Sequence, residues 1–365
     1  MEKLNVYFNN QIVGYLARYE NKYAFEYDPN WLMNGFSISP FSLPLKKGVF
    51  IPNEMIFNGF FGVFADSMPD SWGNLLLDRY LKNKGINHAD GLTRLSIIGN
   101  TGMGGLEYYP NHEMKEKYDF DLDKYQEEAN KILNKEETNI DYLFKFGGSI
   151  GGARPKALIK IDGEDWIVKF ESRYDFKDFG LCEYEYANAC MEIGINIPEV
   201  KLLPSKTNSG YFAIKRFDRN QNKKLHMISA AALLEADFRS PCLDYIELFK
   251  LTKIITKDNM NDLKELFLRM CFNVYAHNLD DHAKNFSYVY DIETKTYRLS
   301  PAYDMTYSNT YYGEHTTSIN GKGINITEED LIIVGKKANL KLEYMEEAIS
   351  LVKDIVNKRL NKYLK

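Results

Sequence analysis

The sequence predicts an α+β protein that divides into two or more lobes. Residues 4–27 alternate apolar and polar side chains with the period of short β-strands, whereas apolar residues after position 229 recur at helical spacing. A chain of 365 residues with 44% hydrophobic and 14% aromatic side chains can bury more than one core. We therefore expect strands early in the chain and helices late in it.

Composition and charge exclude several classes of protein. A net charge of −5 gives no overall electrostatic reason to bind nucleic acid or a membrane surface. Four cysteines lie far apart without a CxxC pattern, which is typical of buried thiols in a reducing compartment and not of a zinc site or a disulfide framework: Cys182, Cys190, Cys242 and Cys271. The N-terminus leads directly into strand-like alternation, and no apolar run has the length of a membrane span. We expect a cytoplasmic protein without export signal or anchor.

The N-terminal third predicts a small sheet and one helix. Residues 4–27 form a β-meander with a turn at Asn9-Asn10. Asp70 or Ser71 can cap a helix that carries Leu75, Leu76 and Arg79, and we expect this helix to pack on the meander.

Two later stretches read as connections. The glycine-rich residues 99–105 precede a strand-like 106–109 and not a helix, which favours a structural turn over a dinucleotide loop. Residues 111–140 are charged and polar, as in Lys115-Glu116-Lys117, and predict a solvated helix and a connector between lobes.

A second glycine-rich stretch carries a phosphate-binding pattern. Glycine pairs at 147–148 and 151–152 permit close backbone approach to an anion, and Arg154 and Lys156 supply positive charge. The stretch is not a Walker A motif, because Ala153 stands where that motif requires lysine. The other interpretation is a glycine-rich β-turn between two strands.

Lys169 lies in the apolar strand-like segment 167–170 that follows. A strand lysine beside a phosphate loop can bridge the α and β phosphates of ATP and pair with a helical glutamate. The candidate partner is Glu183, or failing it Glu185, on a helix predicted over 182–193 that ends at Gly194. A solvated edge lysine and ordinary surface glutamates are the alternative.

The rest of the chain supplies a strand and several helices. The segment 211–219 is strand-like, at a place where a hinge between lobes could offer backbone groups to adenine, although it can also be a simple amphipathic strand. Helical spacing follows at 229–235, at 263–275 and over most of 328–364.

The helix at 263–275 delivers the chemically most informative stretch, residues 278–287. Asp280 can orient a hydroxyl, while Asn285 and, after a short hairpin, Asp304 can hold Mg²⁺ against nucleotide phosphates. This order, an acid followed after four residues by an amide and later by a second acid, is that of the protein-kinase catalytic loop and its metal-binding aspartate. A polar turn that caps the preceding helix is the competing interpretation. The pattern indicates ATP-dependent phosphoryl transfer.

Four motifs in order resemble one known family. Ser149–Lys156, Ile214–Arg219, Asp280–Ser287 and Leu299–Asp304 are together similar to the HipA family of bacterial serine/threonine kinases, the toxins of toxin–antitoxin pairs. The resemblance covers nearly the whole chain, since Met68–Gly73 is similar to the N-terminal subdomain of that family.

The resemblance implies a two-lobed protein-kinase-like fold with an N-terminal β-rich subdomain and a helical C-terminal lobe. Placed on this sequence, it predicts the β-rich subdomain at 1–110, a connector at 111–145, the nucleotide-binding lobe at 146–240 and the helical catalytic lobe at 241–365.

The resemblance also implies individual roles. Asp280, and not its neighbour Asp281, is the catalytic acid, and Asn285 and Asp304 are the metal ligands. Ser149 is a site of autophosphorylation. The implied nucleotide-binding residues are Gly151, Gly152, Ala153, Arg154, Lys156, Lys169, Lys215, Phe217, His282, Lys284, Asn285, Tyr303 and Asp304. Among these, the backbone at 215 and 217 meets adenine, and His282 and Lys284 line the phosphates.

The family further implies ATP and Mg²⁺ as cofactors and a cytosolic protein as substrate, in known members an aminoacyl-tRNA synthetase such as the one for glutamate. Its modification stalls translation and growth. A HipB-like helix-turn-helix antitoxin is the implied partner, through which DNA is contacted indirectly, and no membrane is involved. The alternatives are a small-molecule or lipid kinase on the same fold and a non-catalytic binding module. The intact set Lys169, Asp280, Asn285 and Asp304 speaks against the module.

Overall fold

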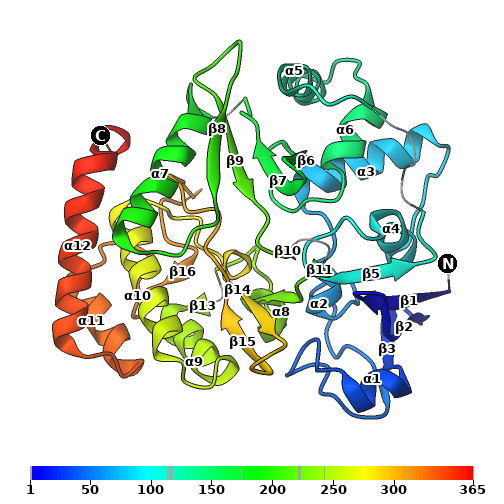
Figure 1. Cartoon of the computed structure of the whole chain (residues 1–365), viewed down its shortest axis with the longest axis horizontal. Helices are drawn as coiled ribbons and strands as arrows, with labels where there is room; N and C mark the ends of the chain where they lie inside the picture. Colours follow the sequence, from blue (N-terminus) through cyan, green and yellow to red (C-terminus); the bar gives the residue numbers. More distant parts are fainter. Residues whose placement is uncertain are drawn as a thin grey trace. The chain divides into compact units, whose positions relative to one another are not determined.

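The computed structural model describes residues 2–112, 114, 118–173, 175–220, 223–241, 243–310 and 312–364, so that Cys242 and the charged run at 115–117 lie outside the described residues. The chain forms two compact units. Unit 1 comprises Met1–Gly180 and Lys201–Ile228, and unit 2 comprises Leu181–Val200 and Ser229–Lys365. The predicted α+β fold, with an N-terminal sheet and a helical C-terminal part, is confirmed (Figure 1).

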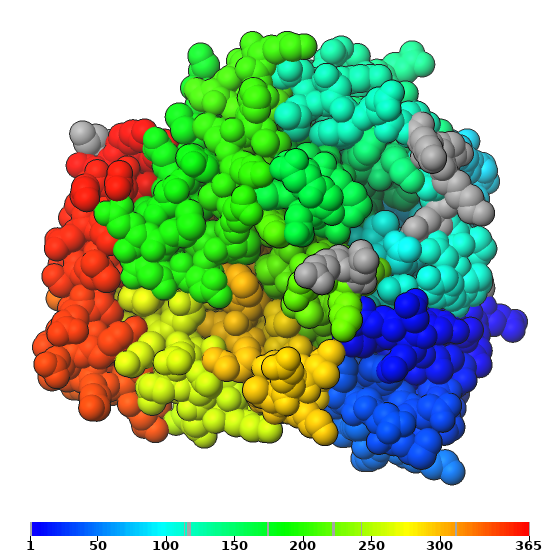
Figure 2. Space-filling view, viewed as in Figure 1, coloured from blue at the N-terminus to red at the C-terminus, as the bar shows by residue number. Residues whose placement is uncertain are grey.

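Unit 1 begins with a five-stranded antiparallel sheet in the order β4-β3-β2-β1-β5. Its strands are β1 (Lys3–Phe8), β2 (Gln11–Tyr19), β3 (Lys22–Tyr27), β4 (Val49–Phe50) and β5 (Leu106–Tyr109). The predicted meander is confirmed, and its first turn places Asn9 and Asn10 at φ of 46° and 66°, a region that asparagine tolerates. The pairing of β1 with β5 brings the blue N-terminal residues beside the cyan ones (Figure 2).

Three helices belong to this part of unit 1: α1 (Pro29–Asn34), α2 (Gly62–Ala65) and α4 (Gly91–Ile98). Helix α4 packs on β1 and β5, and α1 packs on β2. The side chains of Leu4, Val6 and Phe8 alternate into the core, which is the period-two pattern that the sequence displays. The glycine-rich turn at 99–105 leads from α4 into β5, as predicted.

A second sheet of unit 1 has the strand order β6-β7-β9-β8. Its strands are β6 (Lys156–Ile161), β7 (Glu164–Lys169), β8 (Val200–Leu203) and β9 (Tyr211–Lys215), and a short hairpin of β10 (Arg219–Asn220) and β11 (Lys223–Lys224) follows. The strand predicted over 211–219 therefore ends at Lys215. β12 (Met227–Ser229) comes next in the chain.

The core of the second sheet is shared with α3 (Ser71–Asn83), α5 (Leu122–Leu133) and α6 (Ile140–Gly147). Trp72 and Leu76 of α3 join this core, and α3 packs against α6 (Figure 1), whereas the sequence predicted α3 on the N-terminal meander. The charged segment predicted as a solvated helix contains α5, which buries Tyr125 and Ala129 in the same core. Its charged residues occupy the other face.

Unit 2 is built around the long helix α10. Its helices are α7 (Phe179–Ile193), α8 (Ala230–Leu234), α9 (Tyr245–Ile255), α10 (Met260–Tyr275), α11 (Glu328–Lys337) and α12 (Leu342–Leu360), with short 3₁₀ turns η1 (Ala283–Asn285) and η2 (Asn361–Tyr363). Helix α10 packs against α9, α11 and α12. The predicted helices are thus confirmed, α7 starting three residues earlier than predicted and ending before Gly194.

The remaining elements of unit 2 are short strands: β13 (Leu243–Asp244), which pairs in parallel with β16 (Thr317–Ser318), and the hairpin of β14 (Ser287–Asp291) and β15 (Thr296–Leu299). Glu192 of α7 forms ion pairs with Lys358 and Arg359, so the red C-terminal helix runs beside α7 (Figure 2). None of the described helices combines the length and the apolar run that a bilayer crossing requires.

Candidate functional site

Residues 278–287 of unit 2, which the sequence predicts to be the catalytic loop and which keep that name below, connect α10 to β14. Helix α10 fixes the start of the loop, because its apolar face is buried at Leu263, Leu266 and Met270. The 3₁₀ turn η1 then redirects the chain into the hairpin, with the Asn285 amide donating to the His282 carbonyl at 2.9 Å. The loop therefore lies between two well-packed elements.

Two adjacent acids of this loop have opposite environments. The Asp281 side chain is fully buried and accepts hydrogen bonds from the Tyr245 hydroxyl, from His315 Nδ1 and from the Thr317 amide, each at 3.0 Å. The side chain of Asp280, in contrast, is 52% exposed. A saturated, buried carboxylate anchors the backbone, and the exposed one can meet a substrate.

The Asn285 side chain folds back onto the same turn. Its Nδ2 donates to the Asp280 carbonyl at 2.8 Å, an orientation that leaves the Oδ1 oxygen for a cation. His282 Nε2 lies 3.9 Å from Asp280 Oδ1. The turn thus presents a carboxylate, an amide oxygen and an imidazole together.

Asp304 follows the hairpin in a left-handed backbone conformation, with φ of 53°. Such a conformation is uncommon for a residue with a side chain and concentrates at functional sites. The Asp304 carbonyl accepts a hydrogen bond from Asn278 Nδ2 at 3.4 Å, which ties this residue to the start of the catalytic loop.

The donor set suits a hard cation. Among the described residues no group of three or more His, Cys, Asp or Glu side chains could hold a metal ion. One carboxylate at Asp304 and one amide oxygen at Asn285 are instead the kind of partial set that Mg²⁺ completes with phosphate and water oxygens. The residues present therefore fit Mg²⁺ bound together with a nucleotide.

Phe238 organises the basic side chains of the loop. Lys284 Nζ lies 5.0 Å from the centre of the Phe238 ring, and the His282 ring packs against the same ring at 5.4 Å. The Tyr303 hydroxyl donates to the Lys284 carbonyl at 2.8 Å and bonds Ser287 Oγ. The structure thus brings His282, Lys284 and Tyr303 together at the catalytic loop, with the tyrosine hydroxyl bonded to the loop itself.

In unit 1, the glycine-rich loop at 148–155 runs from α6 to β6. The interpretation as a β-turn between two strands is therefore wrong, because a helix precedes the loop. Gly152 has φ of 94°, which disfavours any residue with a Cβ atom. Its amide donates to Asp70 Oδ2 at 3.0 Å, and its carbonyl accepts from the Trp72 amide at 3.1 Å.

Asp70 therefore has a different role from the one predicted. It stands at the N-cap of α3, but its side chain makes no capping hydrogen bond to the helix and reaches the glycine-rich loop. A carboxylate oxygen thus occupies one backbone donor of a loop whose composition suits anion binding.

Two lysines face each other at the end of the second sheet. Lys156 of β6 and Lys169 of β7 are paired residues of neighbouring strands, and only 6% and 9% of their surfaces are exposed. A Cβ on Gly152 would collide with Lys156 Nζ, so this ammonium lies against the glycine-rich loop. Lys169 ends β7, whereas the sequence analysis placed it inside a strand-like segment that continues to residue 170. The pair concentrates positive charge next to the loop.

The other predicted loop residues divide by exposure. Ala153 is exposed, and Ser149 and Gly151 are half-buried. Arg154 Nε donates to Asp175 Oδ1 at 2.9 Å, and its guanidinium lies 3.9 Å from the Phe179 ring centre. Arg154 is thus held by a side-chain pair of its own.

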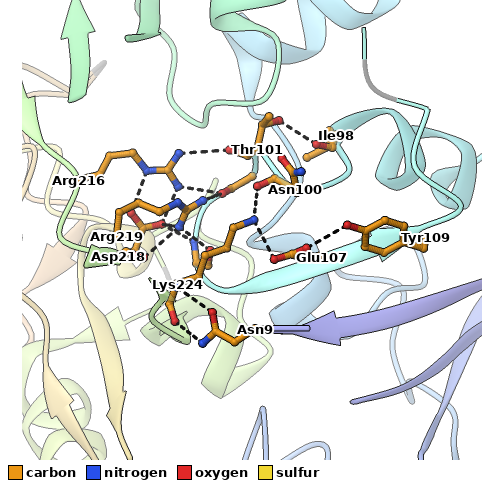
Figure 3. A network of polar contacts seen from close by, with 12 residues as sticks. Asn9, Ile98, Asn100, Thr101, Glu107, Tyr109, Arg216, Asp218, Arg219 and Lys224 are labelled. Atoms are coloured by element: carbon orange, nitrogen blue, oxygen red, sulfur yellow. Dashed lines mark hydrogen bonds and ion pairs between the residues drawn. The ribbon is translucent and has the colours of Figure 1, made fainter. Parts of the chain in front are cut away.

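The segment predicted to meet adenine is fixed by a buried ionic cluster (Figure 3). Arg216, between Lys215 and Phe217, points inward, and its guanidinium bonds Asp218 at 2.7 and 2.9 Å and the Gly102 carbonyl at 2.9 Å. Arg219 donates to Asp218 Oδ2 as well, at 2.8 Å. Burial raises the pKa of Asp218, but the two guanidinium groups outweigh it and hold that pKa at about 2. The cluster fixes the backbone around Lys215 and Phe217.

The predicted partner of Lys169 is buried in α7. Glu183 is 3% exposed, while the alternative Glu185 is bound by Lys362 at 2.7 Å and by the Tyr363 hydroxyl at 2.6 Å. The commitment of Glu185 to the C-terminal residues favours Glu183. The Lys169–Glu183 pair stays a prediction, since the two residues belong to different units.

Sequence reasoning missed residues that hold these loops: Asp70 as a loop ligand, Phe238, Tyr245, Asn273 and His315. Each is an ordinary polar or aromatic residue, and all except Asn273 lie more than 30 residues along the chain from the loop residue that they contact. The only signal in the sequence was the pair of adjacent acids at 280–281. One exposed acid suffices for the turn, so the other could have been expected to be buried and to need hydrogen-bond donors.

Comparisons with known proteins agree on one family. Residues 4–109 match the model described as HipA N-terminal domain, and residues 148–360 match the HipA-like C-terminal domain. A Sinorhizobium fredii protein named "Putative kinase Y4dM" is 29% identical over an alignment of 198 residues, and the match covers 49% of this chain and 47% of that protein. A Haemophilus influenzae protein named "Putative kinase" is 27% identical over an alignment of 186 residues, and the match covers 45% of this chain and 54% of that protein. The chain thus spans about half the length of the curated relatives it matches.

A solved structure extends the similarity to the fold. The solved complex of the Shewanella oneidensis MR-1 toxin–antitoxin system, HipA, HipB and its operator DNA, contains a chain that matches with a TM-score of 0.74. The match covers 99% of this chain and 90% of that chain at 16% identity.

Proposed function

Because the chain belongs to the HipA family, we propose that it is an ATP-dependent serine/threonine protein kinase. The observation that carries the proposal is the turn at 280–285, which presents an exposed carboxylate and an amide oxygen on a loop fixed by a buried acid. The buried lysine pair next to the glycine-rich loop of unit 1 supports it, since two cations opposite each other in a sheet gain from a nearby anion.

Each unit contains groups that suit ATP or Mg²⁺. The backbone of residues 151–153, with Lys156 and Lys169, would receive the phosphates, and the backbone at 215 and 217 would meet adenine. Asn285 and Asp304 would hold Mg²⁺, which neutralises phosphate charge.

In the reaction, the Asp280 carboxylate would orient the substrate hydroxyl and take its proton as the oxygen attacks the γ-phosphorus. The bond from that phosphorus to the bridging oxygen breaks, and ADP leaves. The products are ADP and a phosphoester. His282 and Lys284 would face the transferring phosphoryl group and offer it a polar ring and a positive charge. His282 Nε2 lies 3.9 Å from Asp280 Oδ1.

The test is phosphoryl transfer from labelled ATP to the proteins of a bacterial lysate. Asp280→Asn should reduce transfer at least about a thousandfold and leave Mg²⁺-ATP affinity nearly unchanged, because the lost group acts on the nucleophile. Asp291→Asn, at the exposed hairpin turn of the same unit, is the matched control and should behave as the parent. Parental transfer by Asp280→Asn contradicts the assignment. Label on a small molecule or lipid alone favours a metabolite kinase.

The biological role follows from the family and is part of the proposal. The substrate would be a cytosolic protein such as an aminoacyl-tRNA synthetase, and the partner a helix-turn-helix antitoxin that brings DNA contact indirectly. Expression of the chain alone should arrest bacterial growth, and Asp280→Asn should relieve the arrest. Normal growth with soluble, active enzyme would contradict a toxin.

Ser149 is the proposed site of autophosphorylation. It stands between Gly148 and Ile150 in the glycine-rich loop and is half-buried, so the loop must open before the serine can be modified. A phosphoserine carries close to two negative charges and would compete with the phosphates of ATP for the same loop. Mass spectrometry after incubation with Mg²⁺-ATP should find phosphate on Ser149 in the parent and not in Asp280→Asn. Normal ATP binding by Ser149→Asp would contradict the switch.

A further inference from the structure

A chain of hydrogen-bonded, buried side chains in unit 2 runs from Asp281 to the backbone carbonyl of Asp304. Tyr245 donates its hydroxyl hydrogen to Asp281 Oδ2 at 3.0 Å and accepts from Asn273 Nδ2 at 2.9 Å. Asn273 Oδ1 accepts from Asn278 Nδ2 at 2.9 Å, and that same Nδ2 lies 3.4 Å from the Asp304 carbonyl. We refer to Asp281, Tyr245, Asn273 and Asn278 as the buried polar chain.

Every member of the buried polar chain is excluded from solvent. Their exposed fractions are 2% or less. Hydrogen bonds at such sites are strong, and loss of one partner leaves a polar group without water to replace it. Burial and the neighbouring Asp281 raise the pKa of Tyr245 well above its ordinary value, so the hydroxyl keeps its proton and can donate.

Both ends of the buried polar chain are tied to the backbone of the site. At one end Asp281 binds the Thr317 amide at 3.0 Å, and its own carbonyl accepts from Thr317 Oγ1 at 2.5 Å. At the other end Asn278 reaches the carbonyl of Asp304 itself. The exposed acid Asp280 is the residue directly before the first anchor.

We propose that Tyr245 and Asn273 are positioning residues, which hold Asp280 and Asp304 in a fixed spatial relation through the buried polar chain. The inference deepens the proposed kinase function and rests on it for its catalytic part. Neither residue touches a substrate. A transferable phosphate must meet both the acid and the metal ligand in one geometry, and an error of about 1 Å can cost about a hundredfold in rate.

The test compares two buried tyrosine hydroxyls of unit 2. Tyr245→Phe removes the hydroxyl that joins Asp281 to Asn273. Tyr288→Phe removes an equally buried hydroxyl that bonds Thr252 at 2.7 Å, outside the buried polar chain, and serves as the matched control. Both changes delete a single oxygen atom, so both variants are expected to fold.

The first readout is hydrogen exchange, which needs no catalysis. In Tyr245→Phe the peptides that cover 278–287 and 302–309 should both exchange about fivefold faster, the effect of about one lost hydrogen bond, and in Tyr288→Phe neither should change. The second readout is kinetic. Tyr245→Phe should lower kcat about tenfold while Mg²⁺-ATP affinity stays within about twofold, and Tyr288→Phe should leave both unchanged.

Each outcome decides a separate claim. Equal exchange in the two variants, or faster exchange in only one of the two segments, overturns the coupling of Asp280 to Asp304. Faster exchange in both segments with unchanged kcat overturns the positioning role. If the parent transfers no phosphate to any acceptor, the kinase proposal fails on its own account, and the exchange data alone decide whether the buried polar chain couples the segments.

Discussion

The catalytic loop of unit 2 and the glycine-rich loop of unit 1 are both held by aspartates, but in different surroundings. Asp281 is fully buried and receives bonds from a tyrosine, a histidine and a backbone amide. Asp70 is half-buried and holds the glycine-rich loop by accepting a hydrogen bond from the Gly152 amide. The first arrangement fixes a loop permanently, whereas the second uses a contact that a competing anion can replace.

The difference matches what the two loops must do in the proposed reaction. An acid that orients a hydroxyl works best when its position is constant. A loop that covers phosphates must release ADP and admit ATP in each cycle. The contrast therefore predicts that mutations at the first loop act on stability and rate, and mutations at the second on nucleotide affinity.

The largest expected effect is on folding, from Asp281→Ala. The change leaves the Tyr245 hydroxyl, His315 Nδ1 and the Thr317 amide without their buried acceptor, and should lower the free energy of unfolding by about 3 kcal/mol or more. Chemical denaturation followed by circular dichroism measures it. Asp291→Ala, at an exposed turn, should cost less than about 1 kcal/mol. Equal losses in the two variants would show that Asp281 is no special anchor, and the contrast between the loops would fail.

The second prediction concerns Asp304, the proposed metal ligand. Asp304→Ala should weaken ATP binding in the presence of Mg²⁺ by at least about tenfold, because the carboxylate is lost from the proposed metal set. Without Mg²⁺ the variant and the parent should bind ATP equally. Calorimetric titration with and without chelator separates the two cases. Equal affinity with Mg²⁺ present would remove Asp304 from the metal site.

The third prediction tests whether Asp70 occupies a backbone N–H group that would otherwise bind phosphate. Asp70→Ala frees the Gly152 amide and should tighten Mg²⁺-ATP binding about fivefold, the value of about one hydrogen bond. Asp90→Ala is the matched control, because Asp90 is also a helix N-cap of unit 1 but caps its own helix, at 2.8 Å from the Thr93 amide.

The control variant Asp90→Ala should lose about 1 kcal/mol of stability, and its affinity for ATP should be unchanged. Weaker ATP binding in Asp70→Ala would mean that the carboxylate shapes the loop for ATP and does not compete with it. The glycine-rich loop would then be anchored in the same sense as the catalytic loop.

The fold was predictable wherever the local pattern and the tertiary contacts agree. The meander at 4–27 and the helices α7, α10 and α12 follow directly from apolar periodicity and from turn residues such as Asn9-Asn10. The packing partner of α3 did not follow, because the apolar face of a helix shows that it is buried but not against which sheet. The charged residues of α5 likewise led to the prediction of a solvated helix, although one of its faces is buried.

The candidate site was predictable only in its exposed chemical groups. Asp280, Asn285 and Asp304 carry a recognisable spacing, and their assignment stays a prediction that the geometry supports. The buried supports at Tyr245 and His315 lie about 35 residues from Asp281 on either side, and no local pattern marks such distant contacts. Lys156 illustrates both cases, since its charge was evident in the sequence but its burial opposite Lys169 was not.

The smallest expected effect is on the pH dependence of stability. It concerns the buried histidines, of which we compare one in each unit. His315 of unit 2 faces the carboxylate of Asp281, whereas His226 of unit 1 is fully buried between the rings of Phe8 and Phe36, with Nε2 at 2.8 Å from the Ile38 carbonyl. Burial lowers the pKa of His226 to about 4. Between that value and about 6.5, the ordinary pKa of an unfolded histidine, the unfolded chain binds the extra proton, so the stability of unit 1 falls as the pH is lowered.

From pH 6.5 to 5.5 the loss should reach about 1 kcal/mol. The three tryptophans, Trp31, Trp72 and Trp166, all belong to unit 1, so denaturation followed by tryptophan fluorescence reports on that unit. In His226→Gln, whose amide can still donate to the Ile38 carbonyl but does not titrate, the loss in this interval should disappear. His315→Gln, in unit 2, should retain it. If His226→Gln keeps the parental pH dependence, another group of unit 1 takes up the proton, and the acid sensitivity of this unit does not arise from its buried histidine.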